Sequence, residues 1–392
     1  WSQAAIAQFV KLELDSFIRL HAVPVNEQEA RQVSEALSRE LTGLGPLQPL
    51  LEDPRVEDVL INGYQDIYVS RGGLLERETS HFKDDEHVLR IVRRILAPLG
   101  RRLDESSPMV DARLPDGGRI NVIIAPLSID GPSVSIRKFR KDPLTPKDLV
   151  KLGTFNEDIC RILEMAVQAR CNVLVSGGTS SGKTSLLNAL ASFIPSRERI
   201  VTIEDTAELS LNHNHVVRLE SRPGSFDGTG HVSIRDLLVN SLRMRPDRII
   251  VGEVRSGEVL DLLQAMNTGH DGSMGTIHAS SARECLYRAE MLAGFAGFQG
   301  SEVSLRRQIA NAVDFIVQIG RLSNGRRRLL SLTEVTGMTD NMISMQELYR
   351  YEPTIGSDGQ EIDNWVSMGI SPHSPKLLNW WRSQQAMQGA AR

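Results

Sequence analysis

The chain has 392 residues, a length that suits two or three domains rather than one. Hydrophobic residues make up 41% of it and charged residues 24%, which excludes a fully disordered chain, and its 3 cysteines exclude a disulfide scaffold. The 45 lysines and arginines are outnumbered by 49 aspartates and glutamates, so the net charge of −4 excludes a globally basic nucleic-acid binder but not a local basic patch.

The pattern of residues 1–42 predicts two N-terminal helices. Apolar residues recur at helical spacing until Pro24 interrupts them, and the spacing resumes from residue 27 to residue 41, just before Gly43. From Val56 to Thr79 the pattern changes to short apolar runs divided by Asn-Gly and Gly-Gly pairs, which is typical of strands joined by tight turns.

A small α+β domain is predicted for residues 43–139. Within it, residues 84–99 place their apolar side chains on one helical face, and two further strands are expected at 119–125 and 133–139. Residues 140–153 combine prolines with several charges, and we expect a linker there.

Residues 154–350 predict a second domain of the α/β class. Thr154–Glu157 has the sequence of a capping box that opens a helix. Strand and helix patterns then alternate, which predicts a mostly parallel sheet. Residues 351–392 form a polar tail, in which Trp380 and Trp381 are expected to anchor a helix or to lie on a partner.

Three further features concern the cellular location. No apolar run approaches the roughly 20 residues needed to span a bilayer. Because the chain starts at Trp1 rather than methionine, we expect it to be part of a longer protein. The cysteine spacings fit no zinc or redox motif, so we expect buried free thiols in a reducing compartment. The cysteines are Cys160, Cys171 and Cys285.

A phosphate-binding loop follows a short buried strand at 173–175. It matches the pattern G-x-x-x-x-G-K-[ST] at every position with Gly177, Gly178, Thr179, Ser180, Ser181, Gly182, Lys183 and Thr184. The glycines let successive N–H groups face one phosphate, and the helix that includes Ser185 adds the positive end of its dipole. Lys183 supplies a cation for the outer phosphates and Thr184 a hydroxyl for Mg²⁺, so the loop predicts ATP and Mg²⁺ as ligands.

Two strand ends supply carboxylates. One apolar strand ends in Glu253, and the strand at 200–203 is followed by Glu204. Because ligands of open α/β sheets bind at the carboxyl ends of strands, we expect Glu253 to face the γ-phosphate directly or through water. Glu204 is expected to hold Mg²⁺ or to polarise the attacking water, whereas Asp205 and Glu208 fit a solvated acidic turn equally well.

Two histidines, His270 and His278, lie in the glycine-containing segment Gly269–His278. The glycines indicate tight backbone geometry, and His278 follows a short apolar run that predicts another strand end. We expect both histidines to contact the γ-phosphate or a neighbouring acid. Zinc is the alternative ligand, although no cysteine or H-E-x-x-H partner lies nearby.

Together these four motifs resemble the secretion traffic ATPases, the motor family of type II and type IV secretion and of type IV pili. The family's Walker A loop, acidic box, Walker B segment and histidine box are similar, in that order, to Gly177–Thr184, Thr202–Glu208, Arg245–Glu253 and Gly269–His278. In the Walker B segment Glu253 replaces the usual Asp. The segments that resemble the tight-adherence (Tad/Flp) pilus branch, CpaF-like, are Leu242–Arg255, Gln264–Ser273, Gly43–Leu47 and Val59–Gly63.

The resemblance, which covers about residues 40–350, implies a RecA-like P-loop ATPase domain behind the smaller N-terminal domain. It also implies a hexameric ring of cytoplasmic subunits, peripheral to the inner membrane of a bacterium, with nucleotide held between the two domains. Arginines of the N-terminal domain then reach the phosphates, because their fixed fork neutralises charge well. The candidates are Arg113, Arg119 and Arg137, with solvated hairpin arginines as the alternative.

Arginines of the second domain are weaker candidates for contact with the phosphates. Arg243, Arg245 and Arg255 flank the Walker B strand and either pair with acids or act across a subunit boundary. The run Arg326–Arg328 follows the hairpin signal Asn324-Gly325, and we expect a solvated hairpin rather than a ligand site there.

The function implied by the resemblance is that of a motor. ATP hydrolysis opens and closes the interdomain cleft about the proline-containing linker, and the ring passes this motion to inner-membrane pilus platform proteins. One alternative is a conjugation-type ATPase or nucleic-acid translocase; the acidic net charge and few aromatics disfavour it, so no nucleic acid is expected. The other is a nucleotide-gated scaffold without hydrolysis, which the presence of both Glu204 and Glu253 disfavours.

Overall fold

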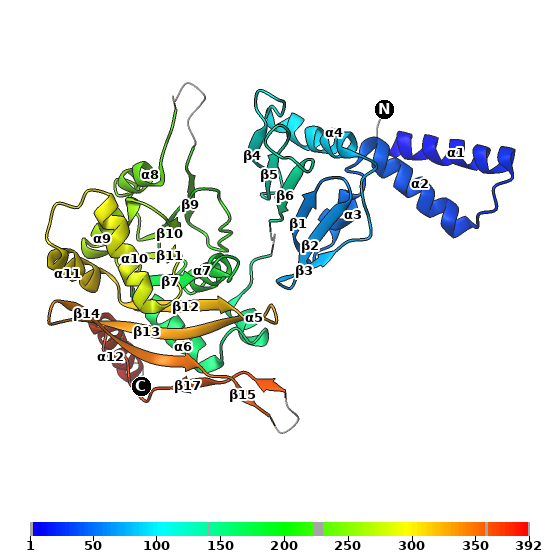
Figure 1. The fold of residues 1–392 in the computed structure, drawn as a ribbon. Coiled ribbons are helices and arrows are strands. Elements are labelled where there is room, and N and C mark those ends of the chain that lie inside the picture. The colour runs from blue at the N-terminus through cyan, green and yellow to red at the C-terminus, as the bar shows by residue number, and fades with distance from the viewer. Residues whose placement is uncertain (1–2, 140–141, 223–229, 357–359, 391–392) are drawn as a thin grey trace. The chain divides into compact units, whose positions relative to one another are not determined.

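The computed structural model describes residues 3–139, 142–222, 230–356 and 360–390 (Figure 1). It divides the chain into two compact units, residues 1–139 and residues 140–392. Trp1, and Arg140 and Lys141 at the start of the segment expected as a linker, lie outside the described residues. Each unit has its own sheet and its own hydrophobic core.

The first unit joins helices to an antiparallel sheet. Its helices are α1 (Gln3–His21), α2 (Glu27–Thr42), α3 (Leu47–Glu52), α4 (Asp85–Leu96) and the 3-10 turn η1 (Ala97–Leu99). Its strands are β1 (Val56–Asn62), β2 (Asp66–Arg71), β3 (Leu74–Arg77), β4 (Met109–Arg113), β5 (Arg119–Ile123) and β6 (Ser133–Arg137). The two N-terminal helices, the helix α4 and the strands around it are confirmed, whereas β4 was not predicted.

The strand order of this first sheet is β3-β2-β1-β6-β5-β4, and every pairing is antiparallel. Buried and exposed residues alternate along β4, β5 and β6, as expected for a sheet with one covered face. The buried residues of the strands pack with those of α4 into one core.

The second unit alternates strands and helices for most of its length. Its helices are α5 (Pro146–Lys151), α6 (Glu157–Gln168), α7 (Lys183–Ala191), α8 (Ile234–Ser241), α9 (Glu258–Asn267), α10 (Ala282–Phe295), α11 (Glu302–Ala312) and α12 (Pro375–Ala390). Its strands are β7 (Val173–Gly177), β8 (Ile200–Glu204), β9 (Val216–Glu220), β10 (Arg248–Val254), β11 (Met274–Ile277), β12 (Phe315–Arg321), β13 (Arg327–Thr339), β14 (Met342–Tyr351), β15 (Thr354–Ile355), β16 (Glu361–Ile362) and β17 (Trp365–Ser367).

A 9-stranded sheet with the order β17-β14-β13-β12-β7-β11-β10-β8-β9 organises this unit. The strands from β12 to β9 pair in parallel, and β13, β14 and β17 extend the sheet by antiparallel pairing. Every residue of β7, β8 and β11 is buried, because two hydrophobic clusters cover the two faces of the sheet. The predicted α/β fold with a mostly parallel sheet is therefore confirmed.

The start of the second unit differs from the sequence prediction in two ways. The helix α6 is capped by Asn156, whose Oδ1 accepts a hydrogen bond from the Ile159 N–H (3.0 Å), and not by Thr154. Because α6 begins at Glu157, Asn156 is its N-cap residue, and Thr154 lies two residues earlier, where its backbone N–H and carbonyl pair with Leu149 and Leu329 (2.8 Å each). The helix α5 also lies within the expected linker.

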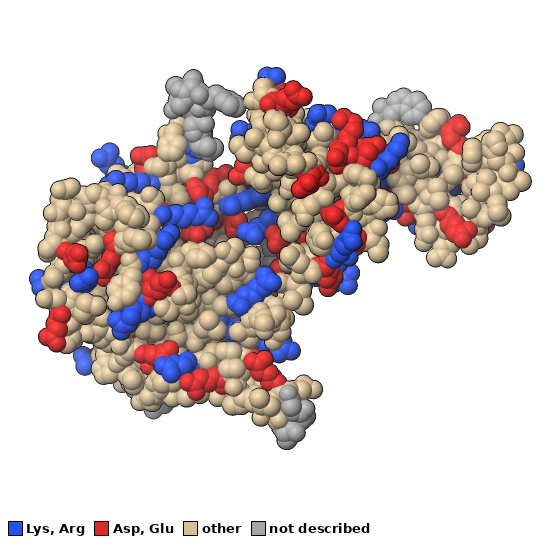
Figure 2. Space-filling model, viewed as in Figure 1, with Lys and Arg blue, Asp and Glu red and all other residues tan. Residues whose placement is uncertain are grey.

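The C-terminal tail, which belongs to the second unit, packs against the rest of that unit. Trp380 of α12 packs against the buried cluster on one face of the sheet, whereas the neighbouring Trp381 is exposed. The three cysteines are free and buried, as predicted. Among the described helices, none combines the length and the apolar character needed to cross a bilayer. On the face shown in Figure 2, acidic and basic side chains are interspersed.

Candidate functional site

Four neighbouring parallel strands, β7, β11, β10 and β8, end at the same edge of the sheet. The phosphate-binding loop follows β7, and Glu204 is the last residue of β8. Glu253 lies near the end of β10, and His278 directly follows β11. The parallel topology therefore gathers these predicted site residues at one edge, which we call the carboxyl edge.

The loop between β7 and α7 is held in a tight conformation. Gly182 has φ +97°, and Ser180 has φ +56°, a left-handed conformation that few residues other than glycine adopt. A side chain on Gly177 would overlap the Ile319 carbonyl oxygen, so β7 and β12 require glycine there. The Ser181 hydroxyl closes the loop by donating to the Gly178 carbonyl oxygen (2.8 Å).

The helix α7 begins at Lys183, so the N–H groups of its first turn, including those of Thr184 and Ser185, point toward the loop without helical partners. The Lys183 Nζ donates to the carbonyl oxygens of Gly177 (3.0 Å) and Gly178 (2.8 Å). Burial lowers the pKa of Lys183, and the nearby negative charge of Glu253 acts in the opposite direction. The loop thus combines oriented N–H donors with one partly dehydrated cation.

Glu204 is a buried carboxylate at the end of β8. Its Oε1 accepts hydrogen bonds from the N–H groups of Glu208 (3.0 Å) and Leu209 (2.9 Å), while its buried Oε2 has no partner among the described residues. Burial raises the pKa of Glu204 to about 7, although the two N–H groups oppose the shift. A Cβ on Gly252 would lie 2.8 Å from the Glu204 Cγ, so β10 can approach only as glycine.

Glu253 is joined to Asp205 by an arginine. The Arg255 Nη2 donates to the Glu253 Oε2 (2.6 Å), and its Nη1 donates to the Asp205 Oδ2 (3.1 Å). The pKa of Arg255 is raised, chiefly by the hydrogen bond to Glu253. Of the two alternatives for Arg255, pairing with acids is the one observed within the chain.

The two histidines lie at opposite edges of the sheet. His278 is exposed beyond the carboxyl end of β11, but His270 precedes β11. The four residues of β11 separate them by about 13 Å along the strand. The sequence prediction that brought His270 to the loop is therefore not supported, because a strand intervenes. Within the described residues, no group of three or more His, Cys, Asp or Glu side chains is arranged to hold a metal ion, as zinc would require.

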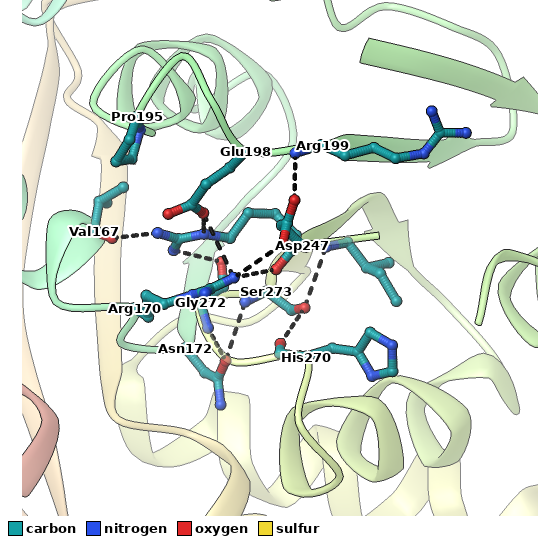
Figure 3. A network of polar contacts seen from close by, with 12 residues as sticks. Val167, Arg170, Asn172, Pro195, Glu198, Arg199, Asp247, His270, Gly272 and Ser273 are labelled. Atoms are coloured by element: carbon teal, nitrogen blue, oxygen red, sulfur yellow. Dashed lines mark hydrogen bonds and ion pairs between the residues drawn. The ribbon is translucent and has the colours of Figure 1, made fainter. Parts of the chain in front are cut away.

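The backbone of His270 belongs to a polar network at the amino ends of the same strands, in which Figure 3 also labels Asn172, Gly272 and Ser273. The fully buried Arg248 donates to the Glu198 Oε2 (2.5 Å) and to the carbonyl oxygens of Val167 (3.0 Å) and Gly272 (3.2 Å). Gly272 has φ +81°, and a side chain there would overlap the Arg248 guanidinium. This glycine of the predicted histidine box thus serves the packing of Arg248.

Asn172 ties the same network to β7. Its Oδ1 accepts the N–H groups of Gly272 (2.8 Å) and Ser273 (3.0 Å), and its Nδ2 donates to the Ala312 carbonyl oxygen (2.6 Å). Ser273 in turn donates to the His270 carbonyl oxygen (2.7 Å) and accepts the Ile249 N–H (3.2 Å). We call this set of contacts the amino-edge network.

The arginine run after the β12–β13 turn is not the solvated hairpin that the sequence predicted. Arg326 is exposed, but the Arg327 Nε donates to the Ser180 carbonyl oxygen in the phosphate-binding loop (3.2 Å). Arg328 is buried and makes a bidentate pair with Asp363 (2.8 and 2.7 Å). Sequence reasoning missed both because they depend on β12 pairing directly with β7 and on the position of the tail.

The three arginines predicted from the N-terminal domain lie in one row. Arg113 on β4 pairs in register with Arg119 on β5, and Arg119 pairs in register with Arg137 on β6. Residues directly opposite one another in adjacent strands present their side chains on the same face. Arg137 also pairs with Asp58 (3.0 Å). Their approach to a nucleotide stays a prediction.

Comparison with protein families matches residues 40–350 to the family described as type II/IV secretion system protein. A putative conjugal transfer protein of Mycobacterium tuberculosis is 36% identical over 336 residues, covering 80% of this chain and 95% of that protein. The type IV secretion system protein VirB11 of Bartonella quintana is 29% identical over 336 residues, covering 76% of this chain and 94% of VirB11.

Among solved structures, the pilus retraction motor PilT with bound ADP superposes with a TM-score of 0.54 at 19% identity, covering 89% of this chain and 88% of PilT. The ATPase DotB of Legionella pneumophila superposes with a TM-score of 0.51 at 20% identity, covering 80% of this chain and 79% of DotB. At these identities the likeness concerns the fold alone.

Proposed function

The chain belongs to the type II/IV secretion system ATPase family, and from this premise we propose that it binds ATP at the carboxyl edge and hydrolyses it to drive a secretion or pilus machine. One observation carries the proposal. The parallel strand ends bring the loop that contains Lys183 to the same edge of the sheet as Glu204 and Glu253, and the buried Oε2 of Glu204 has no partner among the described residues.

Binding of ATP begins with the loop. The N–H groups at the start of α7 receive phosphate oxygens, and the dehydrated Lys183 ammonium exchanges its carbonyl partners for the outer phosphates. The Thr184 hydroxyl and the free oxygen of Glu204 are hard oxygen donors of the kind Mg²⁺ prefers, and they would hold the ion. When bound, Mg²⁺ neutralises charge on the phosphates.

Hydrolysis needs a water molecule aimed at the outermost phosphorus. The Glu253 carboxylate, whose Oε2 is held by Arg255, accepts a hydrogen bond from this water through its second oxygen. Of the two roles expected for Glu204, holding Mg²⁺ is the one proposed, because its Oε1 accepts two backbone N–H groups and its Oε2 cannot hold the ion and take up a proton at once. His278, exposed at the same edge, senses the γ-phosphate.

Beyond one subunit, the proposal is a cytoplasmic homohexamer that works at the bacterial inner membrane through pilus platform proteins. Arg113, Arg119 and Arg137 reach the phosphates from the N-terminal domain, and the proline-rich linker at 140–148 serves as the hinge. Residues 1–42, 43–139, 140–153, 154–350 and 351–392 are proposed as the functional divisions of the chain.

Two candidate machines are supported by different observations. The segments around the Walker B strand resemble the tight-adherence (Tad/Flp) pilus motors, CpaF-like, which favours pilus assembly or retraction. The relatives described as conjugal transfer proteins favour a conjugation-type secretion ATPase. We keep the pilus motor as the first candidate and the conjugation-type ATPase as the second.

Phosphate release by the purified chain, measured with and without DNA, distinguishes an ATP-driven motor from a nucleic-acid translocase and from a scaffold. The size of the assembly is measured in the same buffers with and without ATP. The motor proposal expects phosphate release that DNA does not change, together with a hexamer. DNA-stimulated release that weakens steeply with salt favours a nucleic-acid translocase. Bound ATP that is never hydrolysed contradicts the proposed enzyme and favours a scaffold.

A further inference from the structure

Arg255 links the ends of neighbouring strands at the carboxyl edge. It follows β10 directly, and its guanidinium bridges Glu253 of its own strand end (2.6 Å) and Asp205 beyond the end of β8 (3.1 Å). The other oxygen of Asp205 accepts a hydrogen bond from the hydroxyl of Ser221, which follows β9 (2.8 Å). The contacts therefore run from Glu253 through Arg255 and Asp205 to Ser221.

The planar guanidinium suits this bridge because it offers donors in fixed directions to two carboxylates at once. One oxygen of Glu253 is occupied by Arg255, which fixes the plane of the carboxylate and leaves the second oxygen for a water molecule.

Lys183 is the competing partner for Glu253. The charge of Glu253 is close enough to act on the pKa of Lys183, yet the Lys183 Nζ donates to loop carbonyl oxygens. Without Arg255, Glu253 would be free to turn toward this ammonium. An ion pair between them would remove the carboxylate from the water and the lysine from the phosphates.

We propose that Arg255 is a positioning residue for ATP hydrolysis: it holds Glu253 oriented toward the attacking water and away from Lys183, and Asp205 in turn orients Arg255. This rests on the proposed function. It assigns Asp205 to the support of the site rather than to a solvated turn, and it places Arg255 in its own subunit's site rather than at a subunit boundary.

Steady-state phosphate release against ATP concentration tests the role, in the wild type, Arg255→Ala, Asp205→Asn and the double variant. Loss of orientation is expected to lower kcat about 10- to 100-fold in Arg255→Ala with little change in KM. Asp205→Asn is expected to lower kcat about two- to five-fold, as suits an exposed ion pair. In the double variant, Asp205→Asn should add nothing, because it acts through Arg255.

Arg235→Ala is the matched control. Arg235 also pairs with one carboxylate, that of Asp261 (2.8 Å), and its side chain is 52% exposed against 55% for Arg255. It joins α8 to α9, away from the loop, so its kcat and KM should stay at wild-type values. Arg255→Lys supplies a conservative variant, which keeps the charge but lacks the fork and should fall between wild type and Arg255→Ala.

Several outcomes would overturn the proposal. Arg255→Ala with wild-type kcat excludes the role, and so does a kcat equally low in Arg235→Ala. A raised KM for ATP at unchanged kcat means that Arg255 contacts the nucleotide directly. A smaller assembly of Arg255→Ala in sizing places it at a subunit boundary. If the alanine variant does not fold, the kcat values of Arg255→Lys and Asp205→Asn test the role instead, and wild-type values in both would exclude it. A wild type that releases no phosphate removes the proposed function itself, and this role falls with it.

Discussion

The two edges of the parallel sheet use the same strands, β7, β8, β10 and β11, for opposite purposes. At the amino edge, the side chains of Arg248 and Asn172 have hydrogen-bond partners within the chain, and Gly272 leaves room for Arg248. At the carboxyl edge, Ser180 holds a left-handed backbone, Lys183 is partly dehydrated, and a buried oxygen of Glu204 has no partner in the described parts of the chain.

This difference between the two edges indicates that a ligand binds at the carboxyl edge. Polar groups that are already paired hold strands together, whereas dehydrated and unpaired groups gain free energy only when a ligand supplies their partners. The amino edge should therefore govern stability and the carboxyl edge turnover. Variants at the two edges should therefore differ in which property they lower.

The largest effect is expected from Arg248→Met at the amino edge. The change leaves the buried carboxylate of Glu198 without its closest cation and removes one donor from each of two carbonyl oxygens, so the free energy of unfolding should fall by about 3–5 kcal/mol. Urea denaturation measures this loss. If Arg248→Met were as stable as the wild type, the amino-edge network would not carry the stability assigned to it.

Lys183→Ala at the carboxyl edge should have the reverse consequence. Turnover is expected to fall about 100- to 1000-fold, because a charge that stabilises the transition state is removed. The free energy of unfolding should change little, because the lysine ammonium donates its hydrogen bonds to loop carbonyl oxygens and not to another element of the sheet, as far as the described residues go. Phosphate release and urea denaturation on one preparation check both statements, and wild-type turnover would remove Lys183 from the site.

Glu204 should make stability depend on pH. Because its pKa is raised from 4.5 to about 7 by folding, the native state binds its proton more tightly than the unfolded state. The resulting contribution to the free energy of unfolding is at most about 3 kcal/mol. It is fully present below about pH 4.5 and is lost as the pH rises through about 7. Unfolding measured between pH 5 and 8 should show this slope in the wild type and a flatter one in Glu204→Gln.

The smallest effect is expected from Arg327→Ala. The hydrogen bond from its Nε to the Ser180 carbonyl oxygen helps to hold the left-handed loop, and such bonds contribute about 0.5–1.5 kcal/mol. Nucleotide affinity should therefore weaken about two- to ten-fold, measured by titration with a fluorescent ATP analogue. The exposed neighbour Arg326 provides the control, and an equal loss in Arg326→Ala would point to general charge instead.

Local patterns predicted much of the fold, and contacts between distant segments explain what they missed. The glycine and lysine spacing of the loop and the apolar runs that end in Glu204 and Glu253 indicate strands and a loop directly. The contact of Arg327 with Ser180 joins residues 147 positions apart, and the edge on which His270 lies depends on where a short strand begins. Neither is encoded in a local pattern.

The proposal that Glu253 aims the attacking water is tested most directly by comparing the wild type with Glu253→Gln. ATP binding and phosphate release are measured on the same samples. Glutamine keeps the size of the side chain but removes the charge that aims the water. We predict that the variant binds ATP with affinity close to that of the wild type and releases phosphate at least about 100-fold more slowly. A variant that hydrolyses ATP at the wild-type rate would contradict the proposed role of Glu253 in hydrolysis.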